Sequence, residues 1–198
     1  MSYVAIERTA QDVRRCLAPT VDITAPLPAA QLFEVLDDYS VTIEGKPVRF
    51  DYAVKELAGN IAAEARYDER KSRILIQMSR EAYDELQQDI PRARYTVCHE
   101  IGHGVLHASQ LLRMSTLPHQ KLALERSADH RFFEDTEWQA DAFASALLMP
   151  AVGMHRLETH YGSINTTLLR QHFLVSFQSA TYRLENYQQR GRQLLANA

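Results

Sequence analysis

The feature that most restricts the fold of this 198-residue chain is a histidine pair, His99 and His103, with Glu100 between them. On an α-helix, side chains four residues apart lie on one face, one above the other. Both imidazoles can therefore reach a single zinc ion at the roughly 2.0–2.1 Å that zinc prefers. Glu100 is rotated by about 100° around the helix axis, which places its carboxylate beside the ion. The pattern predicts a zinc site with Glu100 as general base.

The residues around this pair indicate a helix over 91–107. Pro91 suits the first turn of a helix, and the pattern continues to His107. Gly102 and Gly104 are unusual inside a helix, because each costs about 1 kcal/mol relative to alanine. We therefore expect another element to approach the helix closely at both glycines.

The third zinc ligand decides the class of site. A catalytic zinc ion takes three protein ligands and keeps one position open. The metzincin pattern would need glycine at position 106 and histidine at position 109, where this chain has Leu106 and Ser109. That class is excluded, and a carboxylate from a later helix is the remaining source.

Glu137 and Asp141 are the best-placed carboxylates, because they lie one turn apart in a helix predicted over residues 132–148. A gluzincin site has this arrangement. Glu137 would bind the metal, and Asp141 would accept a hydrogen bond from a ligand histidine and fix its tautomer. Glu134 and Asp135 are the local competitors for the ligand role. The alternative is that Glu137 and Asp141 only form a solvated helix face.

Other side chains are candidates for supporting roles. His107 continues the histidine series along the same helix face, as a group that supports a ligand, a substrate contact or a core histidine. Cys98 points to another side of the helix and is expected to be a small, buried hydrophobic residue. A zinc peptidase also needs a donor for the developing oxyanion. Spacing does not choose among three candidates beyond the later helix, Tyr161, His155 and His160.

Outside the histidine helix, the chain alternates between helical and extended patterns. Apolar residues three and four apart indicate helices, whereas alternation around charged or glycine-containing turns indicates strands. The expected elements are a helix at 29–39, extended pieces within 41–50, a hairpin at 61–78, a short helix or turn at 79–88, and helices at 163–173 and 176–187. The first 26 residues are interpreted as an arm or short helix followed by a proline-marked linker.

Composition and charge exclude several classes of protein. Hydrophobic residues make up 45% and charged residues 24% of the chain, which argues against disorder. The net charge of -3 provides no overall attraction to nucleic acid or to a membrane surface. There are two cysteines, no apolar run typical of a secretion signal and no apolar stretch of roughly 20 residues. These features predict a reduced, cytoplasmic protein.

Two longer segments carry a resemblance to a known family. Residues 94–107 read RYTVCHEIGHGVLH, and residues 137–150 read EWQADAFASALLMP. Together they resemble the ImmA/IrrE metallo-endopeptidase family, which shows HExGHxxLH after an aromatic–Thr pair and then ExxA(D/N)xFAxxLLMP. The resemblance covers about residues 30–150 closely and the C-terminal helices more loosely. Two long motifs in the same order are far more specific than the five-residue pattern alone.

The resemblance implies an α+β, gluzincin-like fold with a small mixed or antiparallel sheet packed on the active-site helix. It implies one Zn²⁺ per chain, held by His99, His103 and Glu137, with Glu100 as base. Members are typically bacterial, phage or mobile-element proteins, and some cleave a helix-turn-helix repressor. We therefore expect a zinc-dependent endopeptidase that acts on a regulatory protein, such as a repressor of this type.

The chain is expected to divide into an arm and linker at 1–26, a peptidase domain at 27–155 and a helical segment at 156–198. The last segment resembles the FxVSxxAxxxRL stretch at the end of the family's domains, and also a helix-turn-helix. It is locally basic through Arg170, Arg183, Arg190 and Arg192. We favour packing of these helices on the peptidase domain over DNA binding, because the basic density is modest and no separate linker is visible.

Two alternatives to a peptidase remain at this point. One is a DNA- or protein-binding regulator that uses a metalloprotease-like scaffold with little or no proteolysis. Sequence-specific DNA binding that survives His99→Ala would favour it. The other is a zinc hydrolase acting on a non-peptide amide, which the resemblance makes the weaker alternative. The sequence does not indicate the cleavage site or the oligomeric state.

Overall fold

The computed structural model describes residues 1–116 and 130–196, with the side chains of the second range described from residue 136 onward. Its helices are α1 (Tyr3–Leu17), α2 (Ala29–Glu34), α3 (Arg80–Gln87), α4 (Pro91–Leu106), α5 (Ala108–Ser115), α7 (His130–Leu148), α8 (Ala151–Tyr161), α9 (Thr166–Phe173) and α10 (Phe177–Leu195). Its strands are β1 (Ser40–Ile43), β2 (Lys46–Val54), β3 (Ala63–Asp68) and β4 (Arg73–Met78). The expected α+β fold is confirmed.

The four strands form one mixed sheet in the order β1-β2-β4-β3. β3 and β4 pair antiparallel, with Ala65 opposite Ile76, which confirms the hairpin expected over 61–78. β1 and β2 are also antiparallel, and the turn between them uses Glu44 and Gly45, both with positive φ. β2 and β4 are parallel, so the sheet is not a simple meander. β3 is left at an edge of the sheet.

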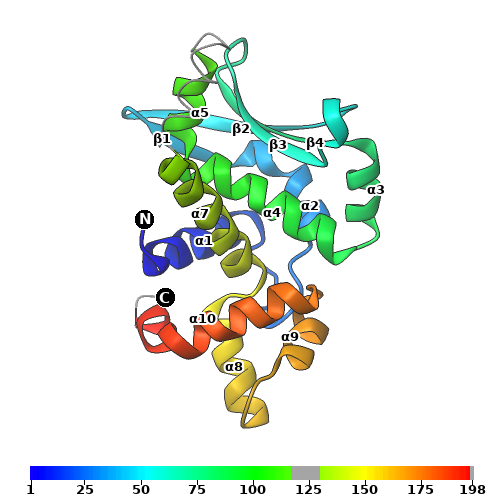
Figure 1. Cartoon of the computed structure of the whole chain (residues 1–198), viewed down its shortest axis with the longest axis vertical. Coiled ribbons are helices and arrows are strands. Elements are labelled where there is room, and N and C mark those ends of the chain that lie inside the picture. The colour runs from blue at the N-terminus through cyan, green and yellow to red at the C-terminus, as the bar shows by residue number, and fades with distance from the viewer. Residues whose placement is uncertain (117–129, 197–198) are drawn as a thin grey trace.

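The elements are stacked along the long axis of the molecule (Figure 1). The sheet lies at the top of the view, α4 lies directly beneath it, and α7 and α1 follow. α8, α9 and α10 form the opposite end. The buried side of α4, with Val97 and Ile101, and the sheet residues Phe50, Ile74 and Ile76 belong to one hydrophobic cluster. α4 is therefore held by the core, and its other side is free to carry polar groups.

The N-terminal segment is part of this core. Ser2 caps α1, and Ile6, Ala10 and Val13 are buried along one side of the helix. The buried Arg14 donates a hydrogen bond to the carbonyl of Leu147 at the end of α7, at 3.1 Å. α1 is thus a packed helix, where the sequence left a choice between an arm and a short helix.

A buried ion pair ties the C-terminal helices to the N-terminus. Arg183 of α10 lies 2.7 Å from Glu7 of α1, and both side chains are only 3% exposed. Glu7 also accepts a hydrogen bond from the amide of Ala151 at the start of α8, and Arg183 donates to the carbonyl of Met149. α8 was not expected from the sequence, and neither was α5. In the described parts of the chain, no helix combines the length and apolar character needed to cross a membrane.

Candidate metal centre

Close packing on both sides of α4 positions the candidate site. A Cβ at Gly102 would lie 3.0 Å from a ring carbon of Phe143 and 3.3 Å from the backbone of Ala140, both in α7. A Cβ at Gly104 would lie 2.6 Å from the ring of Phe50 in the sheet. The close approach expected at both glycines is confirmed. The absence of side chains there lets α7 lie against α4 and brings Glu137 over the histidine pair.

The structure brings His99, His103 and Glu137 together. The Nε2 atoms of His99 and His103 are 3.0 Å apart. The Glu137 carboxylate lies 3.3 Å from each of them, through Oε2 to His99 and Oε1 to His103. Ligand atoms of these three residues all lie within 4.8 Å of one another, so they could hold one metal ion.

These distances fit a tetrahedral metal site. Two ligand atoms that are each roughly 2.0–2.1 Å from a tetrahedral zinc ion lie about 3.3 Å apart. The separations between the three groups are 3.0, 3.3 and 3.3 Å. The side chains of His99 and His103 are 17% and 16% exposed, whereas that of Glu137 is 60% exposed. The group is therefore open to solvent on the Glu137 side, where a further ligand has access.

The other ring nitrogen of each histidine also has a partner. His99 Nδ1 lies 2.9 Å from Asp141 Oδ1. A carboxylate accepts, so Nδ1 of His99 donates and its Nε2 is left as the metal-facing nitrogen. His103 Nδ1 lies 3.2 Å from Nδ1 of His107, which is only 5% exposed. His107 is thus both buried and in contact with a candidate ligand, which fits a supporting group and a core histidine alike.

Sequence reasoning missed Tyr95. Its hydroxyl lies 3.1 Å from Asp141 Oδ1, the same oxygen that faces His99, and 3.2 Å from the Asp141 carbonyl. Burial, together with the negative charge of Asp141, raises the pKa of the Tyr95 hydroxyl, so it keeps its proton and acts as a donor. A signal was present, because Tyr95 precedes His99 by four positions and so shares its helix face.

The electrostatics separate the two histidines. Burial and the neighbouring His99 lower the pKa of His103 to about 4, so its imidazole is neutral at pH 7. Burial also opposes a charge on His99, but the hydrogen bond to Asp141 and the nearby carboxylates outweigh it and raise the pKa. The carboxylates of Glu100, Glu137 and Asp141 create a negative potential at the histidine pair, which a bound cation would neutralise.

Glu100 lies beside the histidine pair on α4. Burial raises the pKa of its carboxyl group to about 7 in the absence of a cation. A carboxyl group with a pKa near the working pH is suited to accept a proton and return it. A divalent cation nearby would stabilise the carboxylate and lower this pKa.

The expected oxyanion donors are not brought to the site. Tyr161, His155 and His160 all lie on α8, which is at the end of the molecule away from the sheet and α4 (Figure 1). The Tyr161 ring packs against His160, and Tyr161 Oη lies 3.3 Å from His172 Nε2.

The side chains of two competing ligands, Glu134 and Asp135, lie outside the described residues. Cys98 is fully buried, as expected, and burial raises the pKa of its thiol to about 12.

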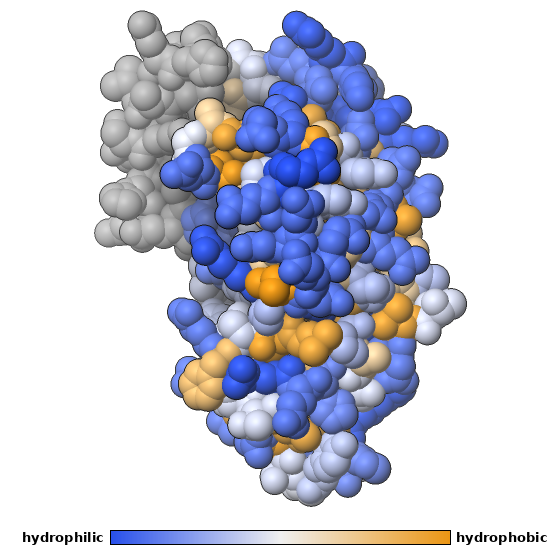
Figure 2. Space-filling view, turned by 90° about the vertical axis from the view of Figure 1, so that its right-hand side faces the viewer, coloured by the Kyte–Doolittle hydropathy of each residue, from blue (hydrophilic) through white to orange (hydrophobic). Residues whose placement is uncertain are grey.

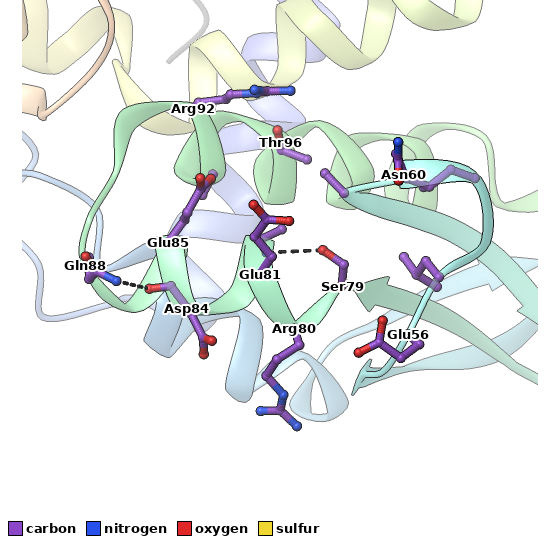
Figure 3. A pocket seen from close by; sticks show the side chains of 15 residues that line it. Glu56, Asn60, Ser79, Arg80, Glu81, Asp84, Glu85, Gln88, Arg92 and Thr96 are labelled. Atoms are coloured by element: carbon purple, nitrogen blue, oxygen red, sulfur yellow. Dashed lines mark hydrogen bonds between the residues drawn. The ribbon is translucent and has the colours of Figure 1, made fainter.

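Two cavities flank the first turns of α4. One, of about 1060 Å³, lies between α4, α7 and α10 and is lined by Glu137 and Asp141. The other, of about 670 Å³, lies between α3, α4 and the segment before β3 (Figure 3). It is lined by carboxylates such as Glu81 and Glu85 but contains none of the three candidate ligands. Proximity to the ligands therefore favours the first cavity as part of the candidate site.

Comparison with known proteins agrees with this geometry. No curated protein matches the chain. The family model described as Peptidase_M78, IrrE N-terminal-like domain, matches residues 83–185, just over half of the chain. The matched range contains both sequence motifs and the three candidate ligands. The chain therefore belongs to the IrrE N-terminal-like family of metallopeptidase-like enzymes, as the resemblance to ImmA/IrrE proteins indicated.

Proposed function

We propose that the chain is a zinc-dependent endopeptidase in which His99, His103 and Glu137 hold one zinc ion and Glu100 is the general base. The observation that carries the proposal is the convergence of the two Nε2 atoms and one carboxylate, with separations of 3.0, 3.3 and 3.3 Å. Two imidazoles and one carboxylate form a donor set typical of catalytic zinc. The open side at Glu137 leaves room for water or substrate.

When bound, zinc supplies Lewis-acid polarisation of the scissile carbonyl and makes a water molecule easier to deprotonate. Glu100 then performs the proton transfers. Its carboxylate takes a proton from the attacking water and gives it to the leaving amine, so the pair of transfers leaves Glu100 unchanged. Its position on the same helix as the histidines fixes its distance from the reacting atoms.

Three further residues are proposed to position the ligands. Asp141 holds the His99 ring through Nδ1, and Tyr95 holds the Asp141 carboxylate through its hydroxyl. His107 holds the His103 ring in the same way on the other side. These partners select the tautomer in which each ligand histidine presents Nε2 to the metal.

The proposed substrate is a protein, and within the family resemblance a regulatory protein such as a helix-turn-helix repressor is the best candidate. We propose that residues 27–155 are the gluzincin-like peptidase unit, extended by 1–26 and by helix-turn-helix-like helices in 156–198. We do not adopt DNA binding as the function. Ala180, Arg183, Tyr187 and Leu194 are buried along α10, so much of this helix is used for packing.

The test is Glu100→Gln with proteome-derived peptides as substrate and new N-termini read by mass spectrometry. The variant should keep one zinc ion and lose cleavage by about 10²- to 10⁴-fold, the usual contribution of a general base. Glu185→Gln, at an exposed position on α10, is the matched control and should cleave normally. Cleavage by Glu100→Gln at the wild-type rate would refute the proposed role.

A further inference from the structure

The cavity of about 1060 Å³ borders the candidate metal centre at Glu137. Glu137, which faces both histidines, and Asp141, which holds His99, are part of its lining. Its other walls come from the first two turns of α4 and of α10. Pockets for bound molecules typically have volumes of about 300–1000 Å³, so this cavity has room for a large side chain and the backbone beside it.

Three aromatic residues are among those that line this cavity. Tyr95, Trp138 and Tyr182 contribute rings from three different helices. Among the lining residues that the structure describes, Arg92 is the only basic one. Aromatic walls favour apolar occupants, because burial of apolar surface is the main source of affinity in such pockets.

The aromatic wall is held in place from behind by α1. The Trp138 indole donates a hydrogen bond to the Tyr3 hydroxyl at 2.9 Å, and the two rings pack edge to face with centroids 4.7 Å apart. The Tyr3 hydroxyl also lies 3.2 Å from that of Tyr182. Arg190 covers the Tyr3 ring, 4.4 Å from its centroid. A pocket whose walls are fixed in advance loses less entropy when it binds a ligand.

Exposed apolar residues adjoin the lining at the α10 end. Ile90 precedes the lining residue Pro91, while Leu174 and Phe177 flank the stretch that begins α10. Their exposures are 39%, 39% and 61%. Arg94 links the turn before α4 to the turn between α9 and α10. Its guanidinium donates hydrogen bonds to the Asp89 carboxylate and to the Leu174 carbonyl.

The face of the molecule with α3 and the α9–α10 turn has apolar surface among hydrophilic residues (Figure 2). These apolar patches are separate from one another, and the exposed side chains of Ile90, Leu174 and Phe177 add apolar surface of the same kind.

We propose that this cavity receives a large apolar side chain, aliphatic or aromatic, of the protein substrate next to the bond that is cut. The inference rests on the proposed function, since the occupant is assigned by the proximity of the cavity to the candidate metal centre. The enzyme therefore selects cleavage positions by the size and apolarity of one substrate residue. Small and acidic residues at that position are poor occupants.

The test compares variants that fill the cavity with one that does not. Ser179→Phe places a ring in the lining, and Gln178→Phe does so from a more exposed position that leaves the core untouched. Ser163→Phe, in the exposed turn after α8, makes the same type of change away from the cavity. The probes are quenched fluorescent peptides that differ only at one central residue: Phe, Leu, Ala, Gly or Asp.

The wild-type enzyme loaded with zinc should cleave the Phe and Leu peptides with kcat/KM at least about tenfold above the Gly and Asp peptides, the discrimination expected of an apolar pocket. The two filling variants should lose this preference, because kcat/KM for the Phe and Leu peptides should fall more than kcat/KM for the Ala peptide. Ser163→Phe should behave as wild type. The inference would be overturned if wild type had the same kcat/KM for all five peptides. It would also be overturned if kcat/KM fell by the same factor for every peptide in both filling variants.

A binding measurement separates this inference from the proposed function. Trp138 is the only tryptophan of the chain and lines the cavity, so its fluorescence reports occupancy. In the Glu100→Gln background, the Phe peptide should change the emission and the Gly peptide should not. Binding of the Phe peptide without cleavage by wild type would refute the peptidase and keep the pocket. Cleavage without side-chain preference would keep the peptidase and refute the pocket.

Discussion

The cluster around Glu7 and the cluster around Glu137 both join distant parts of the chain, but they are completed in different ways. At Glu7 each carboxylate oxygen has a donor, one from Arg183 and one from the amide of Ala151. Both members of the ion pair are 3% exposed. At Glu137 the carboxylate faces two imidazole nitrogens and is 60% exposed.

The difference indicates what each cluster is for. A buried charge is tolerated when its partners are inside the protein, as they are for Glu7. On our proposal, the cluster at Glu137 is completed by a cation from outside, which explains why nitrogen and oxygen acceptors are turned towards one another. The first cluster should therefore govern stability and the second metal binding, and each can be changed without the other.

The largest effect should come from removing a ligand. His103→Ala should abolish binding of stoichiometric zinc, measured by elemental analysis after dialysis, because two ligands do not make a stable catalytic site. Its melting temperature without metal should stay close to that of the metal-free wild type. If His103→Ala retained one tightly bound zinc ion, the cluster at Glu137 would not be the metal site that distinguishes it from the cluster at Glu7.

Removing one member of the buried ion pair should have the opposite profile. Arg183→Met leaves Glu7 charged and buried, and should lower the free energy of unfolding by about 3–5 kcal/mol. Zinc stoichiometry should stay at one in the fraction that remains folded. Chemical denaturation measures the free energy of unfolding. If Glu7→Leu is added and stability is not partly restored, the lone buried charge is not the cause of the loss.

Packing of the helix that carries the histidines is the next test. Gly104→Ala should destabilise the fold by about 1–3 kcal/mol, because its Cβ would lie 2.6 Å from the Phe50 ring. Gly191→Ala is the matched change in α10, where the nearest atom, on Tyr187, is 3.4 Å away. Alanine should stabilise that helix by up to about 1 kcal/mol. Equal effects at the two positions would show that close approach is not the reason for Gly104.

The smallest effect is expected from removing the Tyr95 hydroxyl, which holds Asp141 in place. Tyr95→Phe should weaken zinc binding by about tenfold, the lower end for groups that orient a ligand. The measurement is competition with a chromophoric chelator. Tyr83→Phe removes the same kind of bond, from a tyrosine hydroxyl to Glu34 at 2.6 Å, but away from the site. It should leave zinc affinity unchanged, and an equal loss in both variants would assign Tyr95 a purely structural role.

Local signals in the sequence were sufficient for α4 and the hairpin. Pro91 marks the start of α4, and the alternating residues of 61–78 form β3 and β4. α8 was missed because Pro150 was read only as an end of the preceding helix, whereas it is also the N-cap of the next one. The parallel pairing of β2 with β4 was not predictable, because it depends on which strand of the β3–β4 hairpin lies beside β2.

The parts of the candidate site that could be predicted are those whose residues share one face of a helix. The pair on α4 and the carboxylates on α7 follow from helical spacing, but their meeting depends on the packing at Gly102. Tyr95 needed its partner, Asp141, which is 46 positions away. Spacing could not choose among the oxyanion candidates on α8, because it does not show that this helix begins at the buried Glu7.

The most direct test of the central claim is a crystal structure of the zinc-loaded protein with diffraction measured on both sides of the zinc absorption edge. The account predicts one anomalous peak at about 2.0–2.1 Å from Nε2 of His99, Nε2 of His103 and a carboxylate oxygen of Glu137. A zinc peak bound elsewhere, or at the histidines with Glu137 turned away into solvent, would contradict it.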